Sequence, residues 1–180
     1  MQNEPNYVPL LAALITGVFS FAGAWLATKV SKDGERKHEA RQLAKTFKGE
    51  LSGIIHILEL RDYQTLIKAT AAACRTRNEV LIFPVVARQE YFAIYKANAN
   101  SIGKLQEPLP EQVAIFYTQA ASLLEDFTAL AEMRAGTKSR DILGSPMDAA
   151  ARYEELAGGI DALISRGKTA IVMIDGAYPG

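Results

Sequence analysis

The sequence predicts an all-α protein, in which one N-terminal transmembrane helix precedes a cytoplasmic antiparallel bundle of about four or five helices. Three observations predict this fold class. Residues 8–28 form an uncharged apolar run, and basic side chains gather directly after it. Beyond Gly34, apolar side chains recur at steps of three and four residues nearly everywhere, which is the period of amphipathic helices. Such helices bury their apolar faces best against one another.

The first element is the uncharged run VPLLAALITGVFSFAGAWLAT. At about 1.5 Å per helical residue it is long enough to cross a hydrocarbon core of roughly 30 Å. A single segment in lipid must be helical, because the backbone has no water to hydrogen-bond. The sequence therefore predicts a span over 8–30 that follows a short extracytoplasmic N-terminus, 1–7.

The charges on either side of this run indicate its orientation. Glu4 is the only charged side chain before it, whereas seven basic and three acidic residues lie between Lys29 and Lys48. The positive-inside rule then places the N-terminus outside the cell inner membrane and the C-terminal domain in the cytoplasm. Residues 31–48 form a basic juxtamembrane helical segment, with membrane lipid as its expected partner. The side chains expected to face lipid are Lys29, Lys32, Arg36, Lys37 and Arg41.

A cleaved signal peptide is the alternative interpretation, because Ala22-Gly23-Ala24 resembles a cleavage site. However, no Lys or Arg precedes the run, and the run is longer than the apolar part of a signal peptide, about 7 to 15 residues. The lone Cys74 also fits a cytoplasmic domain, which has no need of paired cysteines. A signal anchor is therefore the favoured interpretation.

One face of the predicted span carries small side chains at steps of three and four residues. Small residues let helix backbones approach closely in lipid, so this stripe predicts self-association and a homo-oligomer. The alternative is that alanine and glycine are simply frequent in membrane helices. The residues of the stripe are Ala13, Thr16, Ser20, Gly23 and Ala27.

Residues 49–180 are predicted to form the cytoplasmic bundle. A long helix, which breaks from the membrane helix only at Ser31–Gly34, presents Leu43, Phe47, Leu51, Ile54 and Leu58 on one face. A second helix is expected over about 62–75, and it buries Tyr63, Leu66, Ile67, Thr70 and Cys74.

Three further helices are predicted along the rest of the chain. The first covers about 91–102, and the second runs from Pro110 to Gly136. The third begins at Ser145-Pro146-Met147-Asp148, which matches a capping box with proline at the first helical position. Its glycines, Gly167 among them, weaken it unless they permit close packing. Periodicity does not separate helix from strand over 170–175, and helix is the interpretation adopted.

No pattern in the sequence predicts catalysis, a cofactor or a metal site. ALISRGKT, residues 162–169, loosely fits a phosphate loop, but the residues before it have a helical period where a strand is needed. Glu35 and His38 form only one Glu-x-x-His motif, whereas di-metal bundles need two. His56 is expected in the core or at its rim.

The remaining ionisable candidates also have plain structural interpretations. Glu59 with Asp62, and Glu125 with Asp126, are neighbouring acids of the kind common on helix surfaces. Cys74 falls on an apolar face and is expected to be a small core residue. The net charge of zero does not favour a nucleic-acid partner, and no small-molecule substrate is evident.

The stretches YKANANSIGKL and VAIFYTQAASLLEDF resemble segments of uncharacterised bacterial single-span membrane proteins with a cytoplasmic helical domain. The resemblance implies the fold and the location, and it implies no activity. The residues that carry it are Tyr95, Asn98, Ile102, Gly103, Leu105, Phe116 and Tyr117.

Two classes of function follow from these features. The first is a membrane-anchored, non-catalytic interaction or scaffolding protein, which binds an unidentified protein partner or self-associates through its anchor. The alternative is a small membrane-perturbing effector of the phage or defence type. An anchored enzyme would require a buried, convergent set of charged side chains.

Overall fold

The computed structural model describes residues 8–85 and 91–179, and for residues 8–28, 30 and 33 it describes the backbone alone. These described residues form α-helices and short 3-10 helices without a strand, which confirms the all-α class. The elements are α1 (Val8–Leu60), α2 (Tyr63–Arg77), α3 (Ala93–Asn98), η1 (Ala99–Lys104), α4 (Leu109–Ala135), η2 (Arg140–Leu143) and α5 (Pro146–Ala177).

Helix α1 is continuous over 53 residues, so the break predicted at Ser31–Gly34 is wrong. A single glycine costs a helix only about 1 kcal/mol relative to alanine, which does not end a helix that continues on both sides. The chain nevertheless divides into two compact units, Met1–Ala40 and Arg41–Gly180. Everything described below as a bundle or a site belongs to the second unit.

Among the residues whose placement the structure describes, no helix combines the length and the hydropathy required to cross a membrane. The side chains of the predicted span and of its small-residue stripe lie outside the described residues.

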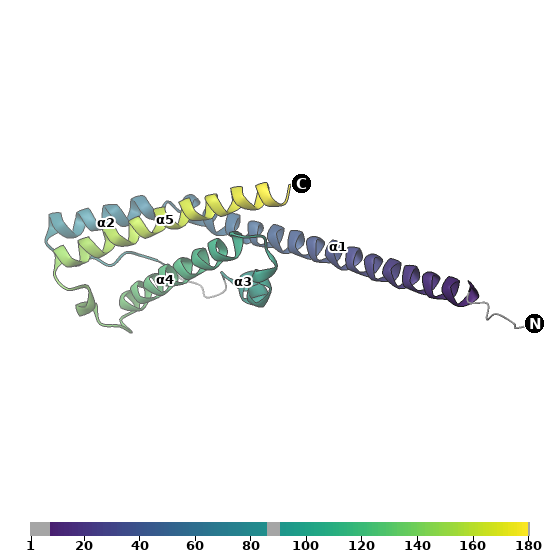
Figure 1. Cartoon of the computed structure of the whole chain (residues 1–180). Coiled ribbons are helices and arrows are strands. Elements are labelled where there is room, and N and C mark those ends of the chain that lie inside the picture. The colour runs from purple at the N-terminus through teal and green to yellow at the C-terminus, as the bar shows by residue number, and fades with distance from the viewer. Residues whose placement is uncertain (1–7, 86–90, 180) are drawn as a thin grey trace, which may run out of the picture. The chain divides into compact units, whose positions relative to one another are not determined.

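Helix α5 is the central element of the bundle (Figure 1). The end of α1 runs antiparallel to its C-terminal half, because Lys48 pairs with Asp175 and Glu59 pairs with Lys168 at 2.7 Å. Helix α2 continues along the N-terminal half of α5 in the same direction as α1. Its partners show this, since Gln64 contacts Asp161 and Arg75 contacts Glu154.

The joint between α1 and α2 is a single left-handed residue. Asp62 has φ 46° and ψ 42°, and its short polar side chain makes it one of the few residue types that tolerate this conformation. The chain can thus start a new helix within two residues, and both helices remain against the same partner, α5.

Helix α4 is the third long element, and it lies antiparallel to α5. Arg166 donates to Gln119 at 3.0 Å, and further along Leu123 lies beside Gly159. The side chains that pack between α1 and α2, α4 and α5 are fully or almost fully buried. Among the largest of them are Phe47, Leu51, Ile67, Val113, Phe116, Tyr117, Tyr153, Ile160 and Leu163.

The structure confirms several local predictions and corrects others. Helix α4 ends at Gly136 with φ 77°, the capping box joins Ser145 to Asp148, and residues 170–175 are helical within α5. The predicted helix over 91–102 is instead split between α3 and η1. On α2, Leu66 is 50% exposed, contrary to prediction, and Ala71 takes the buried position.

Candidate functional site: an apolar pocket with a cationic rim

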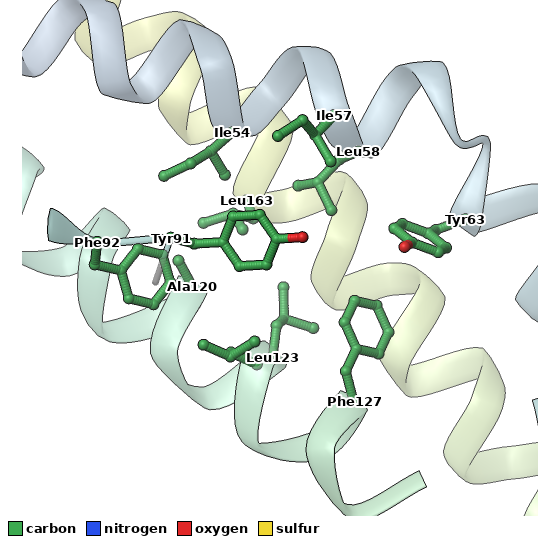
Figure 2. A pocket seen from close by; sticks show the side chains of 11 residues that line it. Ile54, Ile57, Leu58, Tyr63, Tyr91, Phe92, Ala120, Leu123, Phe127 and Leu163 are labelled. Atoms are coloured by element: carbon green, nitrogen blue, oxygen red, sulfur yellow. The ribbon is translucent and has the colours of Figure 1, made fainter. Parts of the chain in front are cut away.

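An apolar pocket of about 60 Å³ opens between α1, α4 and α5. Figure 2 shows side chains of α1 on one side of it, side chains of α4 on the other, and the ring of Tyr91 between them. The lining residues are Ile54, Ile57, Leu58, Tyr63, Tyr91, Phe92, Ala120, Leu123, Leu124, Phe127 and Leu163.

The helical period explains why these residues meet. Ile54, Ile57 and Leu58 share one face of α1, and the α4 residues share the face that includes Leu123 and Phe127. Ala120 contributes only a methyl group to this lining, beside the larger Leu123 and Leu124. A cavity results where the two helices approach, and Tyr91 and Phe92, in the turn before α3, complete its wall.

A cationic side chain contacts one of the residues that line this apolar pocket. Arg61 donates from Nη1 to the hydroxyl of Tyr63 at 2.7 Å, and its Cζ lies 5.9 Å from the centroid of the Tyr63 ring. The Tyr63 hydrogen bond raises the pKa of Arg61 further above its usual value, and the nearby Tyr91 adds to this effect. Arg61 itself is exposed to solvent.

The wall formed by Phe92 is held in place by a carboxylate on α1. Glu50 accepts hydrogen bonds from the backbone N–H groups of Ile94 and Tyr95 at 2.9 and 3.0 Å, and from the hydroxyl of Tyr117. The two amides are among the first of α3, which has no side-chain cap of its own. Glu50 therefore caps α3 from a different helix.

Aromatic rings surround this carboxylate. Tyr117 stacks on Tyr95 with ring centroids 4.0 Å apart, and it meets Phe92 edge to face at 5.8 Å. Burial, followed by the hydrogen bond to Glu50, raises the pKa of Tyr117 far above its usual value, so its hydroxyl stays protonated as a donor. The cluster positions Phe92 in the pocket wall.

Tyr63, at the other end of the pocket, is supported by the extended segment that follows α2. The Tyr153 hydroxyl donates to the carbonyl of Leu81 at 2.9 Å and accepts from the N–H of Phe83 at 3.1 Å. Phe83 in turn meets Tyr63 edge to face at 6.1 Å. Cys74 is fully buried beside this segment, as predicted for a small core residue.

A second, wider concavity of about 880 Å³ follows the outer seam between α4 and α5. It mixes apolar residues such as Met133 and Ile142 with the charged side chains of Asp126 and Arg152. Partial burial, with the neighbouring Glu125 as a second cause, raises the pKa of Asp126. Apolar and charged side chains are therefore mixed along this groove, and they do not indicate one class of ligand.

The residues predicted to face lipid lie in the N-terminal part of the chain or at the start of the bundle. Lys29, Lys32, Arg36 and Lys37 are exposed. Arg41 is only half-buried, and its guanidinium donates to the backbone carbonyl of Pro179. The small-residue stripe of Ala13, Thr16, Ser20, Gly23 and Ala27 lies outside the described side chains.

The other chemical candidates do not come together. Glu35 and His38 are exposed on α1, and His56 is exposed as well rather than in the core. The phosphate-loop pattern at 162–169 lies inside α5, so its backbone N–H groups are not arranged as a loop. Within the described part of the chain, no group of three His, Cys, Asp or Glu residues could hold a metal ion.

Sequence reasoning missed the residues that shape the pocket. Glu50 stands next to Leu51 on a helix whose apolar face is otherwise regular, and this acidic residue beside a buried position was the available signal. No local pattern predicts that Arg61 and Tyr91 lie near the same pocket, because this depends on how segments distant in the sequence pack.

Comparisons of the chain with protein-family models, with curated proteins and with solved structures give no match. The resemblance to bacterial single-span proteins therefore stays a prediction.

Proposed function

We propose that this chain is a membrane-anchored interaction protein whose helical bundle holds an apolar group of its ligand in the pocket between α1, α4 and α5. The observation that carries the proposal is the pocket itself. It is lined by apolar and aromatic residues contributed by four helices and by the turn before α3, and two hydrogen-bonded clusters hold its ends in place.

The arrangement of charges supports binding rather than catalysis. Among the described residues, every ionisable Asp, Glu, Lys, Arg and His side chain is at least partly exposed. Of the described side chains that line the pocket, only Tyr63 and Tyr91 carry polar groups, which are their hydroxyls. Such a site gains its binding energy from removing apolar surface from water.

The proposed anchor is residues 8–30, with the N-terminus outside and the bundle in the cytoplasm. The support comes from the sequence, in which an uncharged run is followed by an excess of Lys and Arg. A reporter fusion at each terminus, together with the intact mass of the membrane-extracted protein, tests this. A periplasmic C-terminus, or loss of the first two dozen residues, would overturn the proposed topology.

The pocket is tested with a neutral apolar probe, 4-methylpentan-1-ol. The full-length chain is placed in lipid nanodiscs, because detergent would compete for an apolar site. We expect saturable shifts of the side-chain methyl signals of Ile54 and Leu163, which both line the pocket.

Two variants connect that signal to the pocket. Ala120→Leu should block binding of the alcohol by filling the space. Leu124→Phe, which should weaken the same binding, replaces it if Ala120→Leu folds poorly. Ala69→Leu, at an exposed position of α2, is the matched control and should bind as wild type does. Equal binding by folded Ala120→Leu and Ala69→Leu proteins would overturn the assignment of the pocket.

A further inference from the structure

We infer that the ligand of this pocket is a carboxylate that carries a short branched apolar group, with the apolar group inside the pocket and the carboxylate on Arg61. This rests on the proposed function, and it names the chemistry of the partner at the same site. The volume of the pocket and the charge of Arg61 each support this inference independently.

The size of the pocket limits the apolar group. One water molecule needs about 10–15 Å³ of such a cavity, so a pocket of about 60 Å³ holds a group of only a few heavy atoms. An isobutyl or isopentyl group has that size, whereas a long acyl chain does not fit. The remainder of a larger ligand would have to lie outside the opening.

The charge at the rim favours an anion. One of the N–H donors of Arg61 is used by Tyr63, and Arg61 forms no ion pair with any acidic side chain in the described residues. Its planar guanidinium carries five N–H donors in a geometry that matches a carboxylate. A ligand carboxylate at the opening can therefore bind two of the remaining donors at once.

The acidic residues nearest in sequence do not use this site. Glu59 is paired with Lys168 at 2.7 Å on α5. Asp62 is exposed, and its negative charge next to Arg61 competes with a ligand anion. Removing that charge should strengthen anion binding, which provides a second variant that acts in the opposite direction.

The carboxylate could come from a free branched-chain acid or from the C-terminal leucine of a peptide. Both present the same chemistry, and they differ in the group attached next to the carboxylate. N-acetyl-leucine imitates the peptide end and 4-methylpentanoate imitates the free acid, so whichever of the two binds more tightly identifies the source.

The test compares 4-methylpentanoate with 4-methylpentan-1-ol on the full-length chain in nanodiscs, by calorimetry at low salt. We expect the carboxylate to bind about three- to tenfold more tightly, as a charge-assisted hydrogen bond at an exposed site would produce. Salt should reduce this advantage.

The variants then assign the advantage to Arg61. Arg61→Gln should remove it by weakening the binding of the carboxylate much more than that of the alcohol, and Asp62→Asn should enlarge it. Arg77→Gln, at an exposed position at the end of α2, is the matched control and should retain it.

Two results would contradict the inference in different ways. If the acid and the alcohol bind equally to the wild-type chain, the anionic ligand is wrong. If Arg61→Gln leaves the advantage intact, the placement of the carboxylate on Arg61 is wrong. In both cases the apolar pocket stands. If neither probe binds, the proposed function of the pocket fails together with the inference.

Discussion

At the scale of single residues, Glu50 illustrates how much of the site depends on one side chain. It is half-buried, and its carboxylate satisfies two backbone amides of α3 and the hydroxyl of Tyr117. Removing a hydrogen-bond partner costs more free energy than forming the bond contributes, because a buried donor without an acceptor keeps its full desolvation penalty. Glu50 therefore acts on the pocket through Phe92 and α3, and it is not one of the described residues that line the pocket.

Substituting Glu50 should destabilise the bundle strongly. Glu50→Ala leaves three donors without their acceptor, and we expect the free energy of unfolding to fall by about 2–4 kcal/mol. Urea unfolding of the full-length protein measures this. Glu125→Ala, at an exposed position of α4, is the control and should change stability by less than about 0.5 kcal/mol. Similar losses in the two variants would contradict the role of Glu50.

Asp148 should make stability depend on acid pH. Its carboxylate accepts hydrogen bonds from the side chain and the backbone N–H of Ser145, and these bonds lower the pKa of Asp148. A pKa lowered by folding contributes stability above the unfolded value, near 3.9, and this contribution is lost as pH falls through the folded value.

We therefore expect the urea midpoint of the wild type to fall below about pH 4 more steeply than that of Asp148→Asn. Ser145→Ala removes the side-chain half of the same interaction and should flatten the profile in the same direction. Equal slopes in wild type and Asp148→Asn would show that the capping box makes no contribution to the acid transition.

At the scale of elements, α5 shows what the sequence can and cannot reveal. Its start was predictable, because the capping box at Ser145 is local, and its apolar period was regular up to Ile174. The close packing of α5 against its neighbours was not predictable, because it depends on residues that are distant in the sequence. A Cβ at Gly167 would lie 2.7 Å from Cδ1 of Ile55 and from Cε2 of Phe116. Gly167 thus lets three helices approach, whereas a Cβ at Gly158 would meet no atom of another described element within 4 Å.

These two glycines of one helix should respond to alanine with opposite signs. Gly158→Ala should stabilise the protein by about 0.5–1 kcal/mol, because alanine favours the helix and meets no other side chain. Gly167→Ala should destabilise it by about 1–3 kcal/mol, since Ile55 and Phe116 must move. Thermal unfolding of both variants checks this, and stabilisation by both would contradict the close approach at Gly167.

The dependence on tertiary packing also explains why the sequence predictions failed for Leu66 on α2 and for the pocket. The period there allowed both Leu66 and Ala71 on the buried face, and only the packing of α2 against α5 decides between them. Arg61 and Tyr91 lie thirty positions apart and act on one opening, which no local pattern reveals. The sequence therefore predicts helices, ends and most core positions, and it misses contacts that depend on tertiary packing.

At the scale of the whole molecule, the proposal divides the chain into an anchoring part and a binding part. The unit Arg41–Gly180 contains the pocket and the residues that hold it. The unit Met1–Ala40 contains the uncharged run and most of the basic segment. On this view the anchor localises the protein and the bundle supplies the specificity.

The anchor stripe separates this proposal from a membrane-perturbing role. Gly23→Leu should reduce crosslinking between copies by closing the small-residue face, and ligand binding by the bundle should be unchanged. Overexpression of the wild type should not depolarise the cell. Growth arrest that Gly23→Leu abolishes would instead favour the effector alternative.

Helix α5 packs against elements that lie far before it along the chain. Arg41 and Lys48, at the beginning of the bundle, bind Pro179 and Asp175, which lie 138 and 127 positions later. The apolar faces of α1, α2 and α4 therefore reach their native packing only after α5 has been synthesised. Until then the nascent chain exposes apolar surface that aggregates readily.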